Sequence, residues 1–525
     1  MTYDAIVVGG GHNGLVCAAY LGRAGRRTLV LEALDRVGGF CTSEETVPDA
    51  PGFLMNATSI DHVVTNIPPS IVDELDLARH GLRWVAPDPF YSYLHPDGLS
   101  IGFWRDTSRT VEEIRRLSPK DAAQYERFVA VMRDFWWTAA PYLQGHPTKV
   151  AAATMLELAK RARRTRKHLA PAARMLLGSP GAIIEEWFER DELKAFLATY
   201  AVATMSSLDE PGSGIVMSVM AVQHQWGVRR PVGGQSAFSE ALAAEVRAQG
   251  GEVRVSAPVA EVLVSGGRAT GVRLASGEEI RAGTVVAALD PITLARKLLP
   301  ASAVPEQLDR ELRGLSVLRN NISGFKGDVA LSTKPTLPKH GREDALLASC
   351  MLIAPSLEYV RRSTSAALRG ELTDEIPLWV ITPTILDRTL VPPGSGGHSL
   401  YIYLPAVPYE LAGGKRWDDV KDKHLQRCLD LFEDCAPGTT AGVIGATATS
   451  PQDLQRFSPV TKGNLFHVDM TLSQFGPWRP TPSMAGYRTP VEGLWHTGAG
   501  AHPLGTLNGW SGRTTARTIL RAGRR

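Results

Sequence analysis

The spacing of apolar residues up to position 31 predicts a βαβ unit. Residues 4–8 form a short apolar run of the kind found in buried parallel strands, and residues 28–31 form a second one. Between them, residues 15–24 are alanine-rich, follow a helical pattern and end at Gly25. A strand, a helix and a second strand in this order are typical of a Rossmann-type sheet.

Glycines and one acidic residue give this unit the fingerprint of a dinucleotide site. Gly9 permits a tight turn, Gly11 lets the backbone approach a pyrophosphate, and Gly14 lets the helix pack closely on the strand. The helix N-terminus offers free N–H groups and its dipole to the phosphates. Glu32 ends the second strand at the expected offset of about 20 residues, where it can bind ribose hydroxyls. A glycine turn with a purely structural role is the alternative.

The rest of the chain alternates between strand and helix patterns. Residues 91–94 and 100–103 read as a hairpin, residues 108–225 as mainly helical, and residues 251–290 as strands that return to the first sheet. Residues 315–475 mix strands with helices, and residues 493–520 form a strand, a glycine turn and a helix. We therefore predict an α/β fold with a dinucleotide-binding domain interleaved with an α+β substrate domain of mixed sheet and helices.

The domain boundaries follow from these patterns. We predict that residues 1–75, 228–300 and 480–525 form the dinucleotide-binding domain. Residues 76–227 and 301–479 then form the substrate domain, with a helical subdomain at about 108–225.

Composition narrows the class of protein. The chain has 525 residues, 44% of them hydrophobic, with a net charge of +3, which gives no indication of nucleic-acid binding. The five cysteines show no C-x-x-C and no metal-ligand spacing, so a reducing compartment and no metal site are expected. Because the first strand begins near residue 3 and no apolar run reaches about 18 residues, we expect neither a signal peptide nor a membrane span, and a cytoplasmic location.

One charged segment stands out. Residues 160–167 hold six positive side chains, with apolar residues on either side. A solvated helix face is the plain interpretation. The alternatives are a basic amphipathic patch that contacts anionic membrane peripherally, and a contact between subunits of a homodimer.

Two further motifs reveal a family resemblance. Gly38 and Gly39 follow closely on Glu32, and residues 493–513 combine a strand, two glycine turns and a helix start. Both resemble motifs of the flavin-dependent amine oxidase and phytoene desaturase superfamily. Leu34 and Phe40 stand where amine oxidases commonly carry arginine, so the chain is not similar to a close amine oxidase.

The motif order looks like that of the phytoene desaturase-related branch, in particular the subgroup of the pyridine nucleotide-disulfide oxidoreductase domain-containing protein 2 type. Segments 76–82, 231–234, 464–470 and 487–490 carry this resemblance. The chain departs from the subgroup at 504–507 and 510–511, which leaves the substrate open.

The resemblance implies that the cofactor is FAD and that the first domain binds it. The residues expected at the cofactor are Gly9, Gly11, His12, Asn13, Gly14, Glu32, Ala33, Gly38, Gly39, Phe40, Cys41, Thr42, Ala57, Val259, Asp290, Gly500, Leu507 and Asn508. For Cys41, a covalent flavin thioether is an alternative to a lining role. The residues expected at the substrate are Asn56, His224 and Trp510.

The chemistry expected of FAD is acceptance of a hydride from a C–H bond. His62, His467 and His502 lie on segments expected near the ring and are candidate catalytic bases, with structural histidines as the alternative. A second fingerprint for NAD(P)H is missing, so oxygen or a quinone is the expected electron acceptor.

These observations predict an FAD-dependent dehydrogenase or desaturase that forms a C=C or C=N bond in a largely apolar small molecule. A redox-neutral isomerase that uses reduced flavin, and a non-catalytic flavoprotein subunit, are the alternatives.

Overall fold

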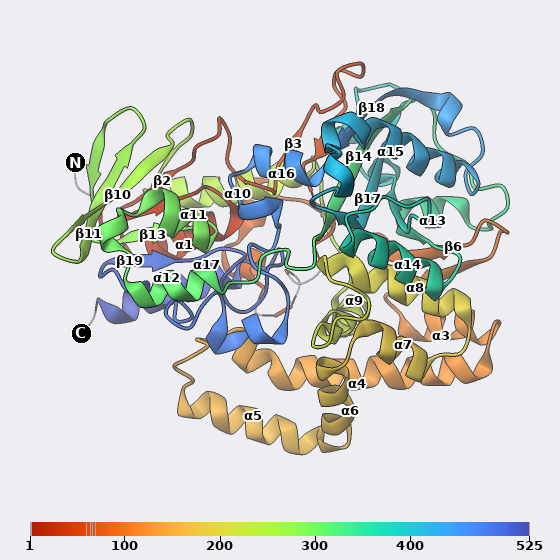
Figure 1. Ribbon diagram of the computed structural model, residues 1–525, viewed down its shortest axis with the longest axis horizontal. Helices are drawn as coiled ribbons and strands as arrows, with labels where there is room; N and C mark the ends of the chain where they lie inside the picture. The colour runs from red at the N-terminus through yellow and green to blue at the C-terminus, as the bar shows by residue number, and fades with distance from the viewer. Residues whose placement is uncertain (1–2, 59, 63–64, 66, 69, 524–525) are drawn as a thin grey trace.

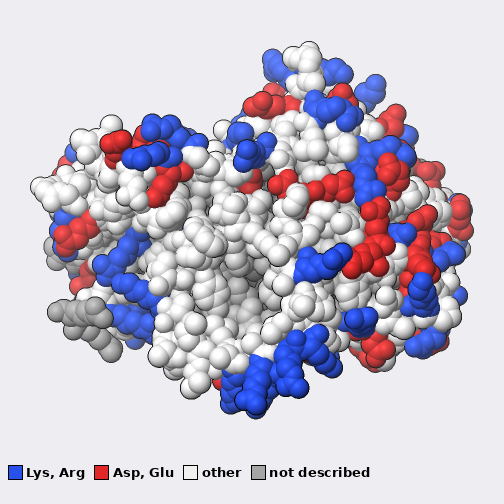
Figure 2. Space-filling view, turned by 60° about the horizontal axis from the view of Figure 1, so that its bottom comes forward, with Lys and Arg blue, Asp and Glu red and all other residues white. Residues whose placement is uncertain are grey.

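The chain folds into two halves that lie side by side, each built on its own sheet (Figure 1). The structure is a computed structural model and describes residues 3–58, 60–62, 65, 67–68 and 70–523. Both ends of the chain lie in the same half. Seen from another side, a hollow lined by uncharged residues lies near the middle of the molecule (Figure 2).

The half that holds both chain ends contains a parallel five-stranded sheet. Its strands, in spatial order, are β19 (Leu494–His496), β13 (Val285–Ala287), β1 (Ala5–Val8), β2 (Thr28–Leu31) and β9 (Glu252–Arg254). The sheet thus joins the beginning, the middle and the end of the sequence. The predicted boundaries of the whole domain stay a prediction.

Both faces of this sheet are covered, which explains why its strands are continuous apolar runs. Val7 and Val30 point to the face covered by α1 (His12–Arg23), α10 (Gln235–Ala248) and α17 (Trp510–Ala522). Ile6 and Val8 point to the other face. That face is covered by an antiparallel meander of β10 (Val259–Ser265), β11 (Arg268–Leu274) and β12 (Glu279–Arg281), followed by α11 (Pro291–Thr293), the π-helical segment η5 (Leu294–Leu298) and α12 (Glu306–Arg313).

The other half contains a mixed seven-stranded sheet. Its order is β18 (Val443–Thr449), β14 (Ile322–Leu331), β17 (His398–Pro408), β16 (Leu378–Ile381), β15 (Cys350–Ile353), β6 (Tyr91–Leu94) and β7 (Ser100–Phe103). Among these described strands, only β6 and β15 pair in parallel. Side chains alternate between two cores: Ile381 and Tyr401 face the helical side, while Val380 and Leu400 face α15 (Trp417–Glu433).

The segment predicted to be mainly helical is helical. Its helices are α3 (Thr107–Arg115), α4 (Pro119–Leu143), α5 (Ala152–Arg164), α6 (Arg166–Leu177), α7 (Pro180–Trp187), α8 (Asp191–Ala201), η3 (Val202–Thr204), η4 (Gly214–Ser218) and α9 (Val219–Trp226). Ser118 caps α4 by accepting a hydrogen bond from Asp121 N, as its sequence predicts. Among the described residues, no helix is long and apolar enough to cross a bilayer.

The remaining elements of the described residues lie outside the two large sheets. They are β3 (Ser43–Glu44), β4 (Met55–Asn56), α2 (Ile71–Glu74), η2 (Leu77–His80), β5 (Trp84–Val85), β8 (Arg230–Pro231), η6 (Ala301–Ala303), α13 (Glu343–Ala348), α14 (Leu357–Leu368), η7 (Pro383–Ile385), η8 (Arg388–Leu390), η9 (Ala412–Gly414), η10 (Thr440–Gly442), α16 (Pro451–Phe457), η11 (Thr461–Gly463), η12 (Leu472–Gln474) and η13 (Gly476–Trp478). β5 pairs with β8: the chain leaves the five-stranded half after β5 and returns to it after β8.

The first and the last helix of the fold pack directly on each other. A Cβ placed on Gly512 of α17 would lie 2.2 Å from the carbonyl oxygen of Asn13 in α1. Gly512 N also donates to Asn13 Oδ1 over 3.3 Å. Only glycine allows the helices to come this close.

We expect Gly512→Ala to destabilise the protein by about 1–3 kcal/mol, because the added methyl group must push α17 away from α1. Gly523→Ala, at the end of the same helix, is the control, since a Cβ there meets nothing closer than 3.5 Å. Thermal unfolding of both variants tests this expectation. Equal melting temperatures would contradict it.

Candidate functional site

The segment from the β1–α1 loop into the first turn of α1 has no room for side chains at two of its glycines. Gly9 has φ +102°, and a Cβ there would lie 2.8 Å from Ala288 O. A Cβ on Gly14 would lie 2.2 Å from Gly9 O. Gly11 differs, because a Cβ there would meet nothing closer than Gly38 O, at 4.0 Å. The backbone at Gly11 and the first N–H groups of α1 are therefore open to an anion.

Glu32 holds this loop in place. It is 7% exposed, and its two carboxylate oxygens accept hydrogen bonds from Gly10 N at 2.7 Å and Leu34 N at 2.9 Å. The carboxylate thus braces the glycine loop, a role that the sequence did not indicate. Each oxygen keeps a further lone pair, so the predicted ribose contact is compatible with these bonds.

The second glycine pair lies against the first loop. Gly38 has φ +120° and donates to Gly10 O over 2.9 Å. Cys41, just beyond the pair, is 1% exposed, with Sγ 3.5 Å from His12 Nδ1. Burial raises the pKa of Cys41 to about 12, so the side chain is a neutral thiol rather than a nucleophilic thiolate. This state favours the lining role over a covalent attachment.

His467 faces the same space from the other end of the chain. It follows Asn464 in a tight loop, has φ +63°, and its Nδ1 has no hydrogen-bond partner among the described residues. Asp290 also directs an unpartnered oxygen, Oδ2, into a buried position, while its Oδ1 caps α11. Burial lowers the pKa of His467 to about 4, so the imidazole is neutral near pH 7.

Arg479 positions the His467 loop. Its fully buried guanidinium donates to Phe466 O over 3.1 Å and to Ala499 O over 2.9 Å. Burial lowers its pKa to about 9. The side chain therefore ties the loop before His467 to the glycine turn after β19, a function that no motif in the sequence announced.

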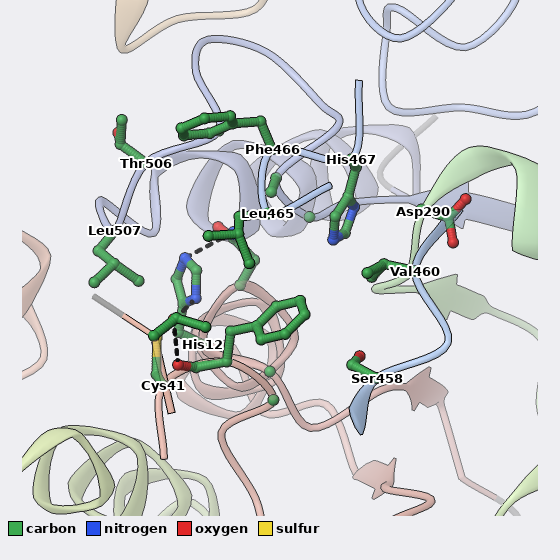
Figure 3. A pocket seen from close by; sticks show the side chains of 18 of the residues that line it. His12, Cys41, Asp290, Ser458, Val460, Leu465, Phe466, His467, Thr506 and Leu507 are labelled. Carbon is green, nitrogen blue, oxygen red and sulfur yellow. Dashed lines mark hydrogen bonds between the residues drawn. The ribbon is translucent and has the colours of Figure 1, made fainter. Parts of the chain in front are cut away.

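These segments enclose a cavity of about 680 Å³. In Figure 3, His12, Cys41, His467, Asp290 and Leu507 surround one space, although they come from distant parts of the chain. The predicted cofactor residues that line this cavity are Gly9, Gly11, His12, Asn13, Gly14, Glu32, Ala33, Gly38, Gly39, Phe40, Cys41, Val259, Asp290 and Leu507.

Four predicted cofactor residues are not among those that line the cavity. The Thr42 hydroxyl donates to Gly39 O over 3.0 Å, and Ala57 O accepts from buried Lys326. Gly500 packs against His467. Asn508 caps α17, with its Oδ1 accepting from the Trp510 backbone N–H at 2.7 Å. These four residues contact the protein rather than the cavity, and their direct contact with the cofactor stays a prediction.

Two of the three candidate bases lie outside the cavity wall. His62 bonds Gln235 Oε1 over 2.7 Å and packs between Trp84 and Phe238. His502 Nε2 bonds Tyr142 O over 3.2 Å. Burial lowers the pKa of each histidine to about 4. Their bonds are those of structural histidines, which leaves His467 as the candidate base that faces the cavity.

The three predicted substrate residues also lie outside the cavity wall. His224 uses both ring nitrogens, with Tyr125 at 2.8 Å and Trp104 O at 2.7 Å. Asn56 Oδ1 accepts from Gln235 N at 2.8 Å. Trp510 is 1% exposed in the core beside α1.

The cavity continues to a group of aromatic side chains, here called the aromatic wall: Tyr91, Tyr200, Trp379, Tyr401 and Tyr403. They come from β6, α8, β16 and β17. Successive ring centroids lie 5.6 to 6.4 Å apart, which is contact distance for aromatic pairs. The wall was not predicted from the sequence, although the Tyr401 and Tyr403 spacing of two places both on one face of a strand.

One polar group stands out beside the aromatic wall. Gln223, at 1% exposed, lines the cavity and its side chain interacts with Tyr91 of the aromatic wall, while its Oε1 has no hydrogen-bond partner among the residues that the structure describes. An unpaired buried amide oxygen is costly unless a ligand donates to it. Among all the residues that the structure describes, no group of three or more His, Cys, Asp or Glu side chains could hold a metal ion.

Comparison with known proteins relates this site to flavoenzymes. The pattern of the family described as "Flavin containing amine oxidoreductase" matches residues 14–326. The chain is 32% identical to the pyridine nucleotide-disulfide oxidoreductase domain-containing protein 2 of Rattus norvegicus, over 99% of this chain and 93% of that protein. It is 25% identical to a neurosporene-forming phytoene desaturase of Cereibacter sphaeroides, over 95% of this chain and 90% of that protein.

Among solved structures, cyclohexylamine oxidase from Brevibacterium oxydans has a similar fold. Its TM-score is 0.61 at 16% identity, and the alignment covers 100% of both chains. The predicted family resemblance and the predicted fold class are both confirmed.

The observed residues fit FAD. The open N-terminus of α1 and Gly11 suit a pyrophosphate, and Glu32 suits a ribose. Asp290 and His467 line the same cavity, and Asp290 Oδ2 and His467 Nδ1 are buried without a hydrogen-bond partner among the described residues. These residues would hold the cofactor.

We expect Glu32→Gln to weaken FAD binding about 10- to 100-fold, because an amide can accept from only one of the two backbone N–H groups now bonded. The control is Glu252→Gln on neighbouring β9, whose carboxylate bonds Tyr3 and Arg254 away from the cavity. Titration of apoprotein with FAD, followed by flavin fluorescence, measures the change. Equal affinity in both variants would contradict the role of Glu32.

We also expect stability to fall as the pH drops from about 6.5 to about 4. Burial lowers the pKa of His62, His224 and His502 to about 4, from 6.5 for an exposed histidine. In this range the unfolded chain binds protons that the folded chain does not, so each site can cost on the order of 3 kcal/mol at the acid end. The measurement is the melting temperature at several pH values. His224→Gln should reduce the slope, and a flat profile for the parent protein would refute the expectation.

Proposed function

The chain belongs to the flavin-containing amine oxidoreductase family and is an FAD-dependent oxidoreductase, and we propose that it forms a C=C or C=N bond in a largely apolar small molecule. The observation that carries this proposal is the aromatic wall. Three strands of the seven-stranded sheet and α8 supply it, whereas the glycine loops that also line the cavity belong to the five-stranded half.

The aromatic wall supports an apolar substrate by its chemistry. Five large rings offer extensive apolar surface to the carbon skeleton of a ligand, and four of them are tyrosines that also carry a hydroxyl. Trp379 uses its indole N–H on Thr199 O at 3.0 Å, and Tyr401 uses its hydroxyl on Thr58 O. These two polar tips are thereby turned away from the ligand.

Gln223 gives such a ligand an orientation. Its Oε1, which has no partner among the described residues, can accept one hydrogen bond, so the proposed substrate combines an apolar body with a donor such as an amine. A fixed orientation places one C–H bond toward the cofactor side of the cavity.

The reaction needs a hydride acceptor and an exit for a proton. FAD supplies the first when it is bound, since its ring accepts a hydride. For the second, His467 Nδ1 is the candidate acceptor, being unpartnered, neutral and at the cavity wall. With a pKa of about 4 it is a weak base, so it would pass a proton on rather than retain it.

Two alternatives remain distinguishable. In a redox-neutral isomerase, His467 would return its proton to a different carbon and no electrons would be taken up. In a non-catalytic subunit, the aromatic wall would hold a ligand and no reaction would follow. Oxygen or a quinone as electron acceptor is a further proposal, which rests on the missing fingerprint for NAD(P)H. A homodimer is another, which rests on the charged segment 160–167 as a candidate contact between subunits. The proposed membrane contact concerns a separate surface, formed by α5 and α6.

We expect anaerobic mixing with the correct apolar substrate to bleach the visible flavin absorbance, since the cofactor takes up two electrons. Apolar amines, for a C=N bond, and apolar compounds with saturated C–C bonds, for a C=C bond, are the first compounds to screen. Product formed only by pre-reduced enzyme, without net bleaching, would indicate the isomerase. Ligand binding without either change would indicate the non-catalytic subunit.

We further expect Trp379→Leu to raise the KM for that substrate about 10- to 100-fold, because a ring of the aromatic wall is lost. The flavin content should not change, since Trp379 lies on the seven-stranded sheet. Trp187→Leu, in α7 outside the cavity lining, is the matched control. An unchanged KM in Trp379→Leu would remove the aromatic wall from the substrate site.

A further inference from the structure

Helix α5 is exposed in an unusual way. None of its 13 residues is buried, although a helix of a globular protein normally buries one face. In Figure 1, α5 lies along the lower edge of the molecule, and α6 turns back from it toward α4. Its attachment is polar: Arg161 donates to Trp137 O in α4 over 2.7 Å.

The outer side of α5 and α6 carries apolar side chains. Met155 is 55% exposed, Leu156 73%, Leu169 40% and Leu177 66%. These four account for half of the eight large hydrophobic side chains that are exposed among the described residues. An exposed group of this kind marks an interaction surface.

The same side carries unpaired positive charge. Five exposed cations have no carboxylate within 4 Å among the residues described: Lys160, Arg163, Arg164, Arg166 and Lys167. Other cations nearby are paired, Arg161 with Glu157 and Arg174 with Glu186. Figure 2 shows Lys and Arg side chains gathered at the lower edge of the face that also bears the hollow.

The two kinds of side chain are arranged in order along α5. Met155 and Leu156 lie in its first turns, and Lys160, Arg163 and Arg164 lie toward its end, all on its exposed side. In α6, Leu169 and Leu177 follow Arg166 and Lys167. Apolar side chains bordered by cations are typical of helices that lie in the plane of a membrane interface.

We propose that α5 and α6 dock on the surface of an anionic lipid bilayer. The four apolar side chains would insert beneath the headgroups, and the five cations would pair with lipid phosphates.

A second copy of this chain fits the surface poorly. A two-fold contact would bring the same five cations of both copies together, and like charges at close range repel. An anionic bilayer instead offers opposite charge and an apolar layer at the same depth.

The surface formed by α5 and α6 lies near the cavity, and this matters for substrate delivery if the proposed function holds. Trp136 of α4 lines the cavity, while the next residues, Trp137 and Thr138, contact Arg161 and Thr165 of the α5–α6 segment. One helix therefore separates the proposed lipid-facing element from the cavity, and a bilayer could deliver an apolar substrate.

Vesicle flotation of the full-length holoprotein tests the docking. We expect binding to vesicles of phosphatidylcholine with phosphatidylglycerol, little binding to phosphatidylcholine alone, and weaker binding at high salt. Replacing Arg163, Arg164 and Lys167 with Gln should weaken binding on the order of 100-fold, at roughly fivefold per charge. Leu156→Asp should also weaken it.

The control replaces Lys415, Lys423 and Arg427 with Gln, which removes the same charge near α15 in the other half. Flavin content and melting temperature of every variant show whether the fold and the cofactor site are intact, so that a failure here is separate from a failure of the proposed function. Equal binding of control and patch variants overturns the proposal. So does a change in oligomeric state of the patch variants, by light scattering, without vesicle binding by the parent protein.

Discussion

The close approach of α1 and α17 is the constraint on which the site depends. Gly512 meets the Asn13 backbone at a distance that excludes any side chain, and Gly14 meets Gly9 in the same way. These contacts bring the first loop of the chain, after β1, and the last glycine turn, after β19, to the carboxyl ends of the strands in the five-stranded sheet. Without them, the loop that suits a pyrophosphate and the loop that carries Leu507 would not share a cavity.

The site is built where two halves with different tasks meet. The five-stranded half supplies backbone N–H groups, a braced carboxylate and unpartnered polar atoms, which suit a charged cofactor. The seven-stranded half supplies aromatic rings and one unpaired amide oxygen. A polar region joined to an apolar region is what a flavoenzyme for an apolar substrate requires.

Buried histidines illustrate how far residue type can suggest chemistry. His62, His467 and His502 were equal candidates in the sequence, and burial lowers the pKa of all three to about 4. All three keep an Nδ1 without a hydrogen-bond partner among the described residues, so their surroundings separate them. His62 and His502 use Nε2 on neighbouring protein groups and do not line the cavity, whereas His467 lines it, on a loop held by buried Arg479 through backbone carbonyls.

The sequence by itself determined the first βαβ unit of the cofactor-binding half, because short-range rules act there. Gly9, Gly14 and Glu32 lie within one βαβ unit, where turn geometry and helix packing require specific residues at fixed spacing. The aromatic wall and the position of His467 were decided only by the tertiary structure. Tyr91, Tyr200 and Trp379 are far apart in the chain, and they meet because the seven-stranded sheet pairs β6 with β15 and packs α8 beside it. No local pattern encodes that meeting, since it arises from strand order and from which face of each strand is covered.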